Sequence, residues 1–182
     1  MAGHNKWSKI KHKKAATDAQ KSKIFSKHAA LIAMESRKAG GDVRSPGLAA
    51  AIERAKKDSM PKDNIERAVA KGSGAGGDAY EEVLFETFGP GGTAMLITAV
   101  TDNNNRTAPE IRHILSRAGV ELGTPGSAAW AFTKTADGYV PVTPMDLSDE
   151  DGEKLASLIE ALEEQDDVQD VYTAADTPDS EV

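Results

Sequence analysis

The sequence contains no cysteine, which excludes disulfide bonds and thiolate metal sites. Aromatic residues make up 5% of the chain, and no apolar run is long enough to cross a bilayer. Residues 1–14 hold no apolar stretch that could form the core of a signal peptide. No spacing matches a zinc site or an EF-hand, so we predict no metal site and no cofactor. We expect a cytoplasmic protein with no membrane partner.

Positive charge is scarce in the second part of the chain. Seventeen of the 22 Lys and Arg residues lie in residues 1–72, whereas 22 of the 29 Asp and Glu residues follow them. The first part therefore carries a net charge of +10 and the remainder −17, a contrast that the overall pI of about 5.1 conceals. Lysine concentrated at one end attracts polyanions, and nucleic acid is the leading class of partner.

The charge contrast and a glycine-rich stretch define the predicted domains. Residues 1–72 form a basic helical, nucleic-acid-binding domain, and residues 73–78 form a glycine-rich linker, because they have no side chain suited to packing. Residues 79–175 form an acidic α+β domain, and residues 176–182 a flexible tail. The first domain is a three-helix bundle preceded by a lysine-rich arm. Its helices are expected over residues 17–39, from Ser45-Pro46 onward, and from Pro61 to Gly72.

The α+β domain is predicted to begin with a hairpin of two strands, residues 80–88 and 93–101, joined by the turn 89–92. A helix is then expected with Thr107 as its N-cap and Pro109 in its first turn. Further strands are predicted over residues 128–133, with Trp130 and Phe132 on one face, and over 139–142 and 168–172. Ser148 caps the second helix. The simplest fold is a ferredoxin-like α+β domain with two helices on one face of a mostly antiparallel sheet.

Lysines in the arm and the first helix are the main candidate site. Eight of them accompany a single acid within residues 1–27, far from the mixed charges of an ordinary surface. Lysine acts as a point charge, so these residues predict phosphate contacts and affinity more than sequence specificity. Two arginines join the set because they supply cationic charge in the acidic domain. The predicted nucleic-acid-binding residues are His4, Asn5, Lys6, Trp7, Lys9, Lys11, Lys13, Lys14, Lys21, Lys23, Lys27, Arg106 and Arg112.

The role of Trp7 has two interpretations. Its ring, set among lysines, could stack on an unpaired base, or it could pack against the bundle. Arg106 also has a second interpretation, since it lies in a polar strand-to-helix junction whose side chains could simply satisfy the backbone.

Enzyme signatures are weak. The loop 89–92 lacks the Lys-Ser/Thr pair of a phosphate-binding loop and does not lead into a long helix. His113 has Glu110 three residues before it, but no nucleophile accompanies the pair. We therefore predict a protein that is not an enzyme.

Several motifs, in order along the chain, closely resemble the YebC family of probable transcriptional regulators, which includes the mitochondrial translational activator of cytochrome oxidase synthesis. They are residues 2–7, 10–16, 23–25, 60–68, 89–92, 101–103, 105–107, 111–113, 126–127, 129–130 and 132. The resemblance implies an N-terminal helical domain followed by α+β domains, a cytoplasmic location, and binding of DNA or ribosomal RNA. It assigns the family's nucleic-acid-contacting role to Lys6, Lys9, Lys11, Lys13 and Lys14.

The chain departs from this family pattern in one place. Family members carry a further α+β domain before the helix that follows Ser148, whereas here only residues 134–147 fill that interval, too few for a domain. The sequence therefore predicts a shortened member that lacks the inserted middle domain.

Our main hypothesis is a DNA-binding transcriptional regulator. The alternative is a ribosome-associated translation factor or translational activator that binds ribosomal RNA. A third hypothesis is a protein-interaction module whose arm meets an acidic protein or its own acidic domain. The sequence leaves open the choice of DNA or RNA and the oligomeric state.

Overall fold

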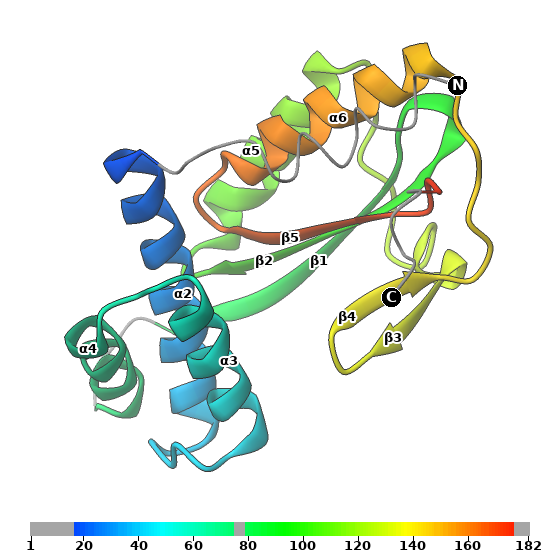
Figure 1. The fold of residues 1–182 in the computed structure, drawn as a ribbon. Helices are drawn as coiled ribbons and strands as arrows, with labels where there is room; N and C mark the ends of the chain where they lie inside the picture. Colours follow the sequence, from blue (N-terminus) through cyan, green and yellow to red (C-terminus); the bar gives the residue numbers. More distant parts are fainter. Residues whose placement is uncertain (1–16, 75–78, 177–182) are drawn as a thin grey trace. The chain divides into compact units, whose positions relative to one another are not determined.

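The computed structural model describes residues 17–74 and 79–176 (Figure 1). The chain divides into two compact units, which we call the helical unit and the α+β unit. The helical unit contains helices α2 (Asp18–Lys38), α3 (Pro46–Lys57) and α4 (Lys62–Ser73). The predicted three-helix bundle and α+β class are both confirmed. In the described residues, no helix has the length and apolar character required to span a membrane.

Local signals position the three helices. At the start of α2, the Thr17 hydroxyl accepts a hydrogen bond from the Gln20 backbone while the Gln20 side chain accepts one from Thr17, forming a capping box. Helix α3 begins with Pro46, whose fixed φ suits the first helical position. Ser45 precedes it, as predicted, although its side chain makes no capping hydrogen bond.

One apolar cluster joins the three helices. Its buried members come from α2, α3, the connection between α3 and α4, and α4. They are Ile32, Leu48, Ala51, Ala55, Met60, Ile65 and Ala68. Alanines in this cluster allow the helices to approach closely. Gly72 takes part in that approach, because a Cβ atom built on it would lie 2.1 Å from the Ala33 carbonyl oxygen of α2. The prediction that Gly72 ends the helix was wrong, since α4 continues to Ser73.

The α+β unit contains two sheets where a single sheet was predicted. Strands β1 (Glu81–Phe88), β2 (Ala94–Thr101) and β5 (Val168–Thr173) form the larger sheet in the order β1-β2-β5. Strand β2 pairs antiparallel with β5 and aligns Leu96 with Tyr172. Strands β3 (Phe132–Thr135) and β4 (Gly138–Pro141) form a separate antiparallel hairpin.

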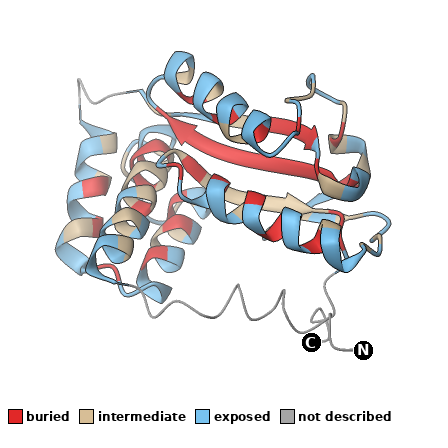
Figure 2. Ribbon diagram, turned by 90° about the horizontal axis from the view of Figure 1, so that it is seen from above, coloured by how far each residue is buried: buried red, intermediate tan, exposed pale blue. Residues whose placement is uncertain are grey.

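The larger sheet is covered on both faces. Helices α5 (Asn104–Arg117) and α6 (Asp149–Glu163) lie over one face (Figures 1 and 2). On the other face, Ala94 and Leu96 of β2 pack in one cluster with Phe132 of the hairpin. Because side chains alternate along a strand, Met95 and Ile97 point to the helix-covered face. Every residue of β2 is therefore buried, as Figure 2 shows.

The start of α5 differs from the prediction. The helix begins at Asn104, so Thr107 lies inside it and is not its N-cap. Thr107 is buried, and its hydroxyl donates a 2.6 Å hydrogen bond to the Asp167 carboxylate. Pro109 consequently lies within the helix and not in its first turn. The capping signal was misread because the true partner of Thr107 lies 60 residues further along the chain.

The strand predicted over residues 128–133 was wrong in its first part. Ala129–Ala131 form a 3-10 turn, and β3 begins only at Phe132. The backbone N–H groups of Ala128 and Ala129 donate to the Glu86 carboxylate, so they are not available to a strand ladder. Trp130 and Phe132 do not share a buried face, since Trp130 is 71% exposed and Phe132 8% exposed.

Candidate nucleic-acid interface

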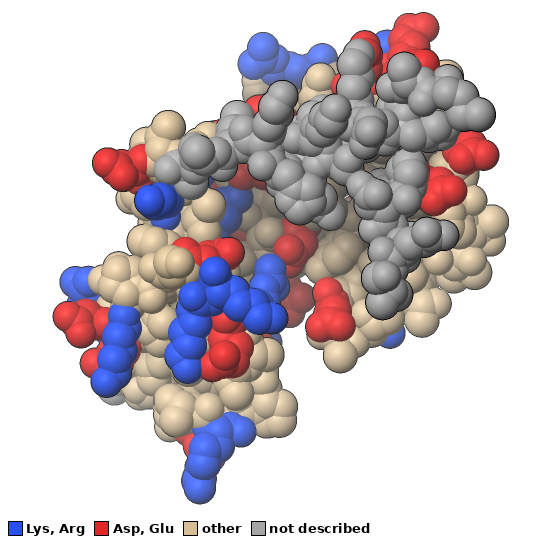
Figure 3. All heavy atoms as spheres, viewed as in Figure 1, with Lys and Arg blue, Asp and Glu red and all other residues tan. Residues whose placement is uncertain are grey.

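Positive charge dominates the described helical residues. Residues 17–74 contain twelve Lys and Arg against seven Asp and Glu, a net charge of +5. Figure 3 shows Lys and Arg side chains spread over the visible face of α2–α4, with acidic side chains between them. By contrast, residues 79–176 contain five Lys and Arg against nineteen Asp and Glu, a net charge of −14. The charge contrast found in the sequence thus separates the segment that forms the three helices from the residues that follow it.

Part of the helical charge is neutralised locally. Lys38 lies 2.8 Å from Glu35, and Lys56 lies 2.7 Å from Glu53, each pair one helical turn apart. The hydrogen bond from Lys56 lowers the pKa of Glu53. Solvent screens such exposed pairs, and the helices still carry more positive than negative charge.

The structure describes three of the predicted lysines. Lys21, Lys23 and Lys27 lie on α2, where Lys21 is exposed and the other two are partly buried. Lys23 and Lys27 are one turn apart and share one side of the helix, whereas Lys21 faces another side. Eight other predicted residues lie outside the described part of the chain. They are His4, Asn5, Lys6, Trp7, Lys9, Lys11, Lys13 and Lys14.

A groove of about 510 Å³ lies between α2 and α4. Its α2 wall presents hydroxyl groups and one aromatic ring, its α4 wall presents an amide and two cations, and a tyrosine lies at one end. These residues are Ser22, Ser26 and Phe25, then Asn64, Arg67 and Lys71, and Tyr80. Sequence analysis missed this site because its walls come from helices about 40 residues apart. The closeness of Phe25 to Lys23 and Lys27 in α2 was the one available signal.

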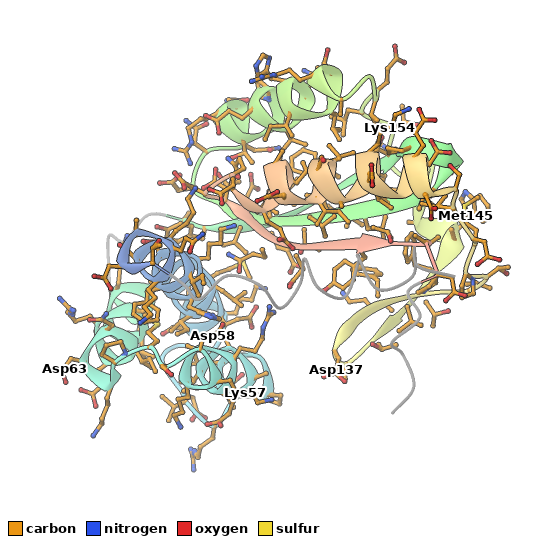
Figure 4. All side chains as sticks on the ribbon, turned by 45° about the horizontal axis from the view of Figure 1, so that its top comes forward. Lys57, Asp58, Asp63, Asp137, Met145 and Lys154 are labelled. Atoms are coloured by element: carbon orange, nitrogen blue, oxygen red, sulfur yellow. The ribbon has the colours of Figure 1, made fainter. Side chains whose placement is uncertain are left out.

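A buried histidine connects α2 to the end of α3. His28 is 6% exposed, and its Nε2 atom lies 2.6 Å from Asp58 Oδ2. The imidazole N–H donates to the carboxylate, which satisfies a polar group that burial would otherwise leave unpaired. Asp58 and its neighbour Lys57 lie at the C-terminal end of α3 (Figure 4). This pair stabilises the bundle and holds the helix that carries the α2 lysines.

Arg106 of α5 forms an ion pair within the α+β unit. Its Nη2 atom lies 3.0 Å from Asp167 Oδ2, and the Asp167 side chain is 14% exposed. Burial opposes ionisation of Asp167, but hydrogen bonds from Thr107, Arg106 and Gln165 outweigh it and lower the carboxyl pKa. Arg106 therefore has a structural partner. Arg112, the other predicted arginine, is exposed on the same helix.

Glu86 is a buried carboxylate in β1, only 5% exposed. It accepts hydrogen bonds from the backbone N–H groups of Gly126, Ala128 and Ala129 at 2.7, 2.8 and 2.8 Å. Burial alone would raise its pKa, but these three donors outweigh burial and lower the pKa below its ordinary value. Glu86 thereby fixes the loop that precedes Trp130.

Trp130 projects from this fixed loop. Its indole N–H donates a 2.7 Å hydrogen bond to the Ser127 carbonyl, while the ring remains largely exposed. Val140 of β4 and Val142, which follows that strand, are also exposed. The sequence pattern of alternating apolar residues gave no sign that this tryptophan lies outside the core.

No group of three or more His, Asp or Glu side chains in the described residues is arranged to hold a metal ion. Among its described lining residues, the α2–α4 groove has neither a carboxylate nor an imidazole.

Fold and charge together define a class of two-unit protein, in which a positively charged helical unit precedes an acidic α+β unit. The model of the TACO1/YebC protein N-terminal domain matches residues 5–75. The model of the TACO1/YebC second and third domain matches residues 80–137 and 133–175. The chain belongs to the TACO1/YebC family, as the sequence motifs predicted.

Two bacterial relatives, each named a probable transcriptional regulatory protein, show the extent of the similarity. The Fervidobacterium nodosum relative is 44% identical over 97% of this chain and 71% of its own length. The Pseudothermotoga lettingae relative is 35% identical over 100% of this chain and 96% of its own length. Among solved structures, a conserved hypothetical protein from Aquifex aeolicus matches with a TM-score of 0.83 and 30% identity, covering 97% of this chain and 98% of that chain. These relatives support a regulatory role.

The comparisons also confirm the predicted shortening. The alignment with the Pseudothermotoga lettingae relative extends over 244 residues, whereas this chain has 182, so the relative carries residues that this chain lacks. The family model matches in two segments that meet at residues 133–137, within β3 and the turn before β4. The β3–β4 hairpin thus stands where relatives carry the additional segment.

Proposed function

We propose that this protein regulates gene expression in the cytoplasm by binding nucleic acid through the helical unit and the lysine-rich residues before it. The observation that carries the proposal is the charge difference between the two described parts of the chain, +5 for residues 17–74 against −14 for residues 79–176. A positively charged unit attracts phosphates, and an acidic unit on the same chain repels them. The helical unit therefore supplies the binding surface, and the α+β unit supplies shape or partner contacts.

Lysine chemistry determines the type of contact. Lys21, Lys23 and Lys27 on α2, together with the arm lysines, contact phosphates as point charges. Phosphate contacts set affinity and orientation but do not read bases. Sequence or shape preference must therefore come from other groups, of which the α2–α4 groove is the best described.

DNA is the polymer that the relatives favour. The matched relatives are named probable transcriptional regulatory proteins, and a transcriptional role implies contact with promoter DNA. On this proposal the protein acts as a DNA-binding transcriptional regulator. It acts by binding, without catalysis.

A ribosome-associated translation factor is the second candidate, and the groove favours it. Phe25 and Tyr80 place aromatic rings beside Arg67 and Lys71. Proteins that recognise RNA commonly stack unpaired bases on aromatic side chains next to cations. In duplex DNA the bases are paired and stacked, so no unpaired base is available to stack on these rings.

Crosslinking in cells, followed by sequencing of the bound nucleic acid, tests the proposal. Enrichment of promoter DNA supports the transcriptional role, whereas recovery of ribosomal RNA without promoter DNA replaces it with the translational one. If neither is recovered and the purified chain has no nucleic-acid affinity at physiological salt, the protein-interaction hypothesis takes their place.

A further inference from the structure

The groove between α2 and α4 combines three properties. It is large enough for a small ligand, since its volume of about 510 Å³ falls within the range of about 300–1,000 Å³ typical of such sites. It is lined by cations without a carboxylate among its described lining residues. It also presents aromatic rings, Phe25 from α2 and Tyr80 from the segment that leads into β1.

The cations come from one side of α4. Arg67 and Lys71 are one helical turn apart, so both side chains project along the same wall. The Arg67 guanidinium donates hydrogen bonds to the Asn64 side chain and, at 3.3 Å, to the Asp63 carbonyl. These contacts orient the planar guanidinium, which favours recognition of a phosphate over a diffuse charge effect.

Lys71 connects the charged wall to the aromatic end. Its Nζ atom lies 3.3 Å from the Tyr80 hydroxyl and 5.2 Å from the centre of the Tyr80 ring. The ring is therefore held beside a cation, and Tyr80 is only partly buried. A base that stacked on this ring would place its own phosphate within reach of the α4 cations.

The opposite wall suits the rest of a nucleotide. Ser22 and Ser26 are one turn apart on α2. The Ser26 hydroxyl donates a 3.0 Å hydrogen bond to the Ser22 carbonyl and can still accept one, and the Ser22 hydroxyl can donate to or accept from sugar and base atoms. Phe25 lies between them in the sequence, and Ala29 and Ala68 give the groove an apolar floor. The lining thus changes from cationic to apolar across the groove, as the chemistry of a nucleotide does from phosphate to base.

We infer that this groove binds an unpaired nucleotide, with its phosphate against Arg67 and Lys71 and its base beside Tyr80 and Phe25. The inference rests on the proposed binding of nucleic acid and specifies which form is bound: a single strand, a loop or a base turned out of a helix. A duplex contacts the lysines through its phosphates but leaves the groove empty, because its bases are stacked and paired.

Binding of the full chain to three labelled probes tests the inference: a short oligouridine strand, its deoxy counterpart, and a DNA duplex. Tyr80→Ala removes the ring, and Tyr80→Phe keeps the ring but loses the hydroxyl. Stacking contributes about 1–3 kcal/mol per base by alanine substitution, so Tyr80→Ala should weaken single-strand binding roughly 5- to 150-fold. Tyr80→Phe should retain most of the affinity, and duplex affinity should change little in either variant.

Salt and a matched control separate stacking from general electrostatics. Because stacking releases no counterions, the loss in Tyr80→Ala should be similar at about 50 mM and about 200 mM salt. Lys71→Gln should weaken single-strand binding more than Lys57→Gln, which removes the same charge from an exposed position on α3 outside the groove. Circular dichroism shows whether each variant remains folded. Should Tyr80→Ala unfold the chain, Lys71→Gln against Lys57→Gln decides the question.

The outcomes distinguish this inference from the proposed function. If the wild-type chain binds none of the probes, the proposed function and the inference both fail. If it binds single strands and neither Tyr80→Ala nor Lys71→Gln lowers that affinity beyond the control, the inference is overturned while the proposed function stands. A preference for oligouridine over its deoxy counterpart identifies RNA as the source of the nucleotide, and the reverse preference identifies single-stranded DNA. Either preference, together with the loss of affinity in the groove variants, supports binding of an unpaired nucleotide in the groove.

Discussion

The Glu86 carboxylate accepts a 2.8 Å hydrogen bond from the backbone N–H of Ala128, which lies 42 residues further along the chain. The same carboxylate accepts hydrogen bonds from Gly126 and Ala129. Three donors directed at one buried negative charge replace the water that the charge would have outside the protein. This arrangement attaches the loop before Trp130 to strand β1.

Replacing Glu86 with glutamine should lower the free energy of unfolding by about 2–3 kcal/mol, because the amide group presents N–H donors to backbone N–H donors. Urea denaturation followed by circular dichroism measures the change. Hydrogen exchange of the Ala128 amide should also become faster. The control is Glu82→Gln, an exposed carboxylate on the same strand, which should change stability by less than about 0.5 kcal/mol. Equal effects of both substitutions would show that Glu86 does not hold the loop.

The stability difference between wild type and Glu86→Gln should depend on pH. The folded-state pKa of Glu86 is lowered, so its contribution is fully present above the unfolded pKa of about 4.3 and is lost as the pH falls through the folded pKa. We expect a constant difference between about pH 5 and 7 that narrows below about pH 4. Urea denaturation of both proteins across this range measures it. A difference that is the same at pH 3 and pH 7 would exclude the ionised carboxylate as its source.

Replacing Gly72 with alanine should destabilise the helical unit by about 1–3 kcal/mol, the usual cost of overpacking. The new Cβ atom would lie 2.1 Å from the Ala33 carbonyl oxygen and 2.8 Å from Ser36 Cβ. A backbone carbonyl cannot rotate away, so α2 and α4 would have to separate. The reverse change at the exposed Ala70 should cost only about 0.5–1 kcal/mol of helix propensity. Wild-type stability in Gly72→Ala would rule out this close approach.

Arg106 and Arg112 lie on the same helix but should respond differently to substitution. Arg106→Gln breaks the ion pair with Asp167 and should lower stability by about 0.5–1 kcal/mol, a small value because the Arg106 side chain is 46% exposed. Arg112→Gln should leave stability unchanged because the side chain is exposed. Denaturation and nucleic-acid affinity should be measured for both variants. Loss of affinity without loss of stability in Arg106→Gln would assign Arg106 to the binding surface.

The helical unit was largely predictable because its signals are local. The spacing of apolar residues in residues 17–39, the proline after Ser45 and the proline before α4 each act within one or two helical turns. The charge contrast also follows from composition alone. These features indicated the class of protein and the end of the chain where the binding lysines are predicted.

The errors arose where a partner lies far away in the sequence. The sequence around Thr107 is typical of an N-cap, but the Thr107 hydroxyl donates its hydrogen bond to Asp167, which lies 60 residues further along the chain. The sequence around Trp130 fits a strand pattern. The backbone before Trp130 nevertheless forms a turn, because its N–H groups donate to Glu86, about 40 residues earlier in the chain. Neither partner is visible in a local window, because burial and pairing are decided by the fold.

The α2–α4 groove could not be predicted for a related reason. Phe25 and Arg67 lie 42 residues apart, and only the packing of α2 against α4 brings their side chains to one groove. The sequence motif that contains Arg67 supported membership of the family, but it did not indicate which residues lie opposite Arg67 in the groove. Site geometry therefore required the structure.

The salt dependence of nucleic-acid binding tests the central claim most directly. If six lysines of the arm and α2 each neutralise a phosphate of duplex DNA, the logarithm of the affinity should fall against the logarithm of the salt concentration with a slope of about −5. Replacing Lys9, Lys11, Lys13 and Lys14 with glutamine should weaken binding and bring the slope to about −2. Unchanged affinity and slope in this variant would contradict binding through these lysines.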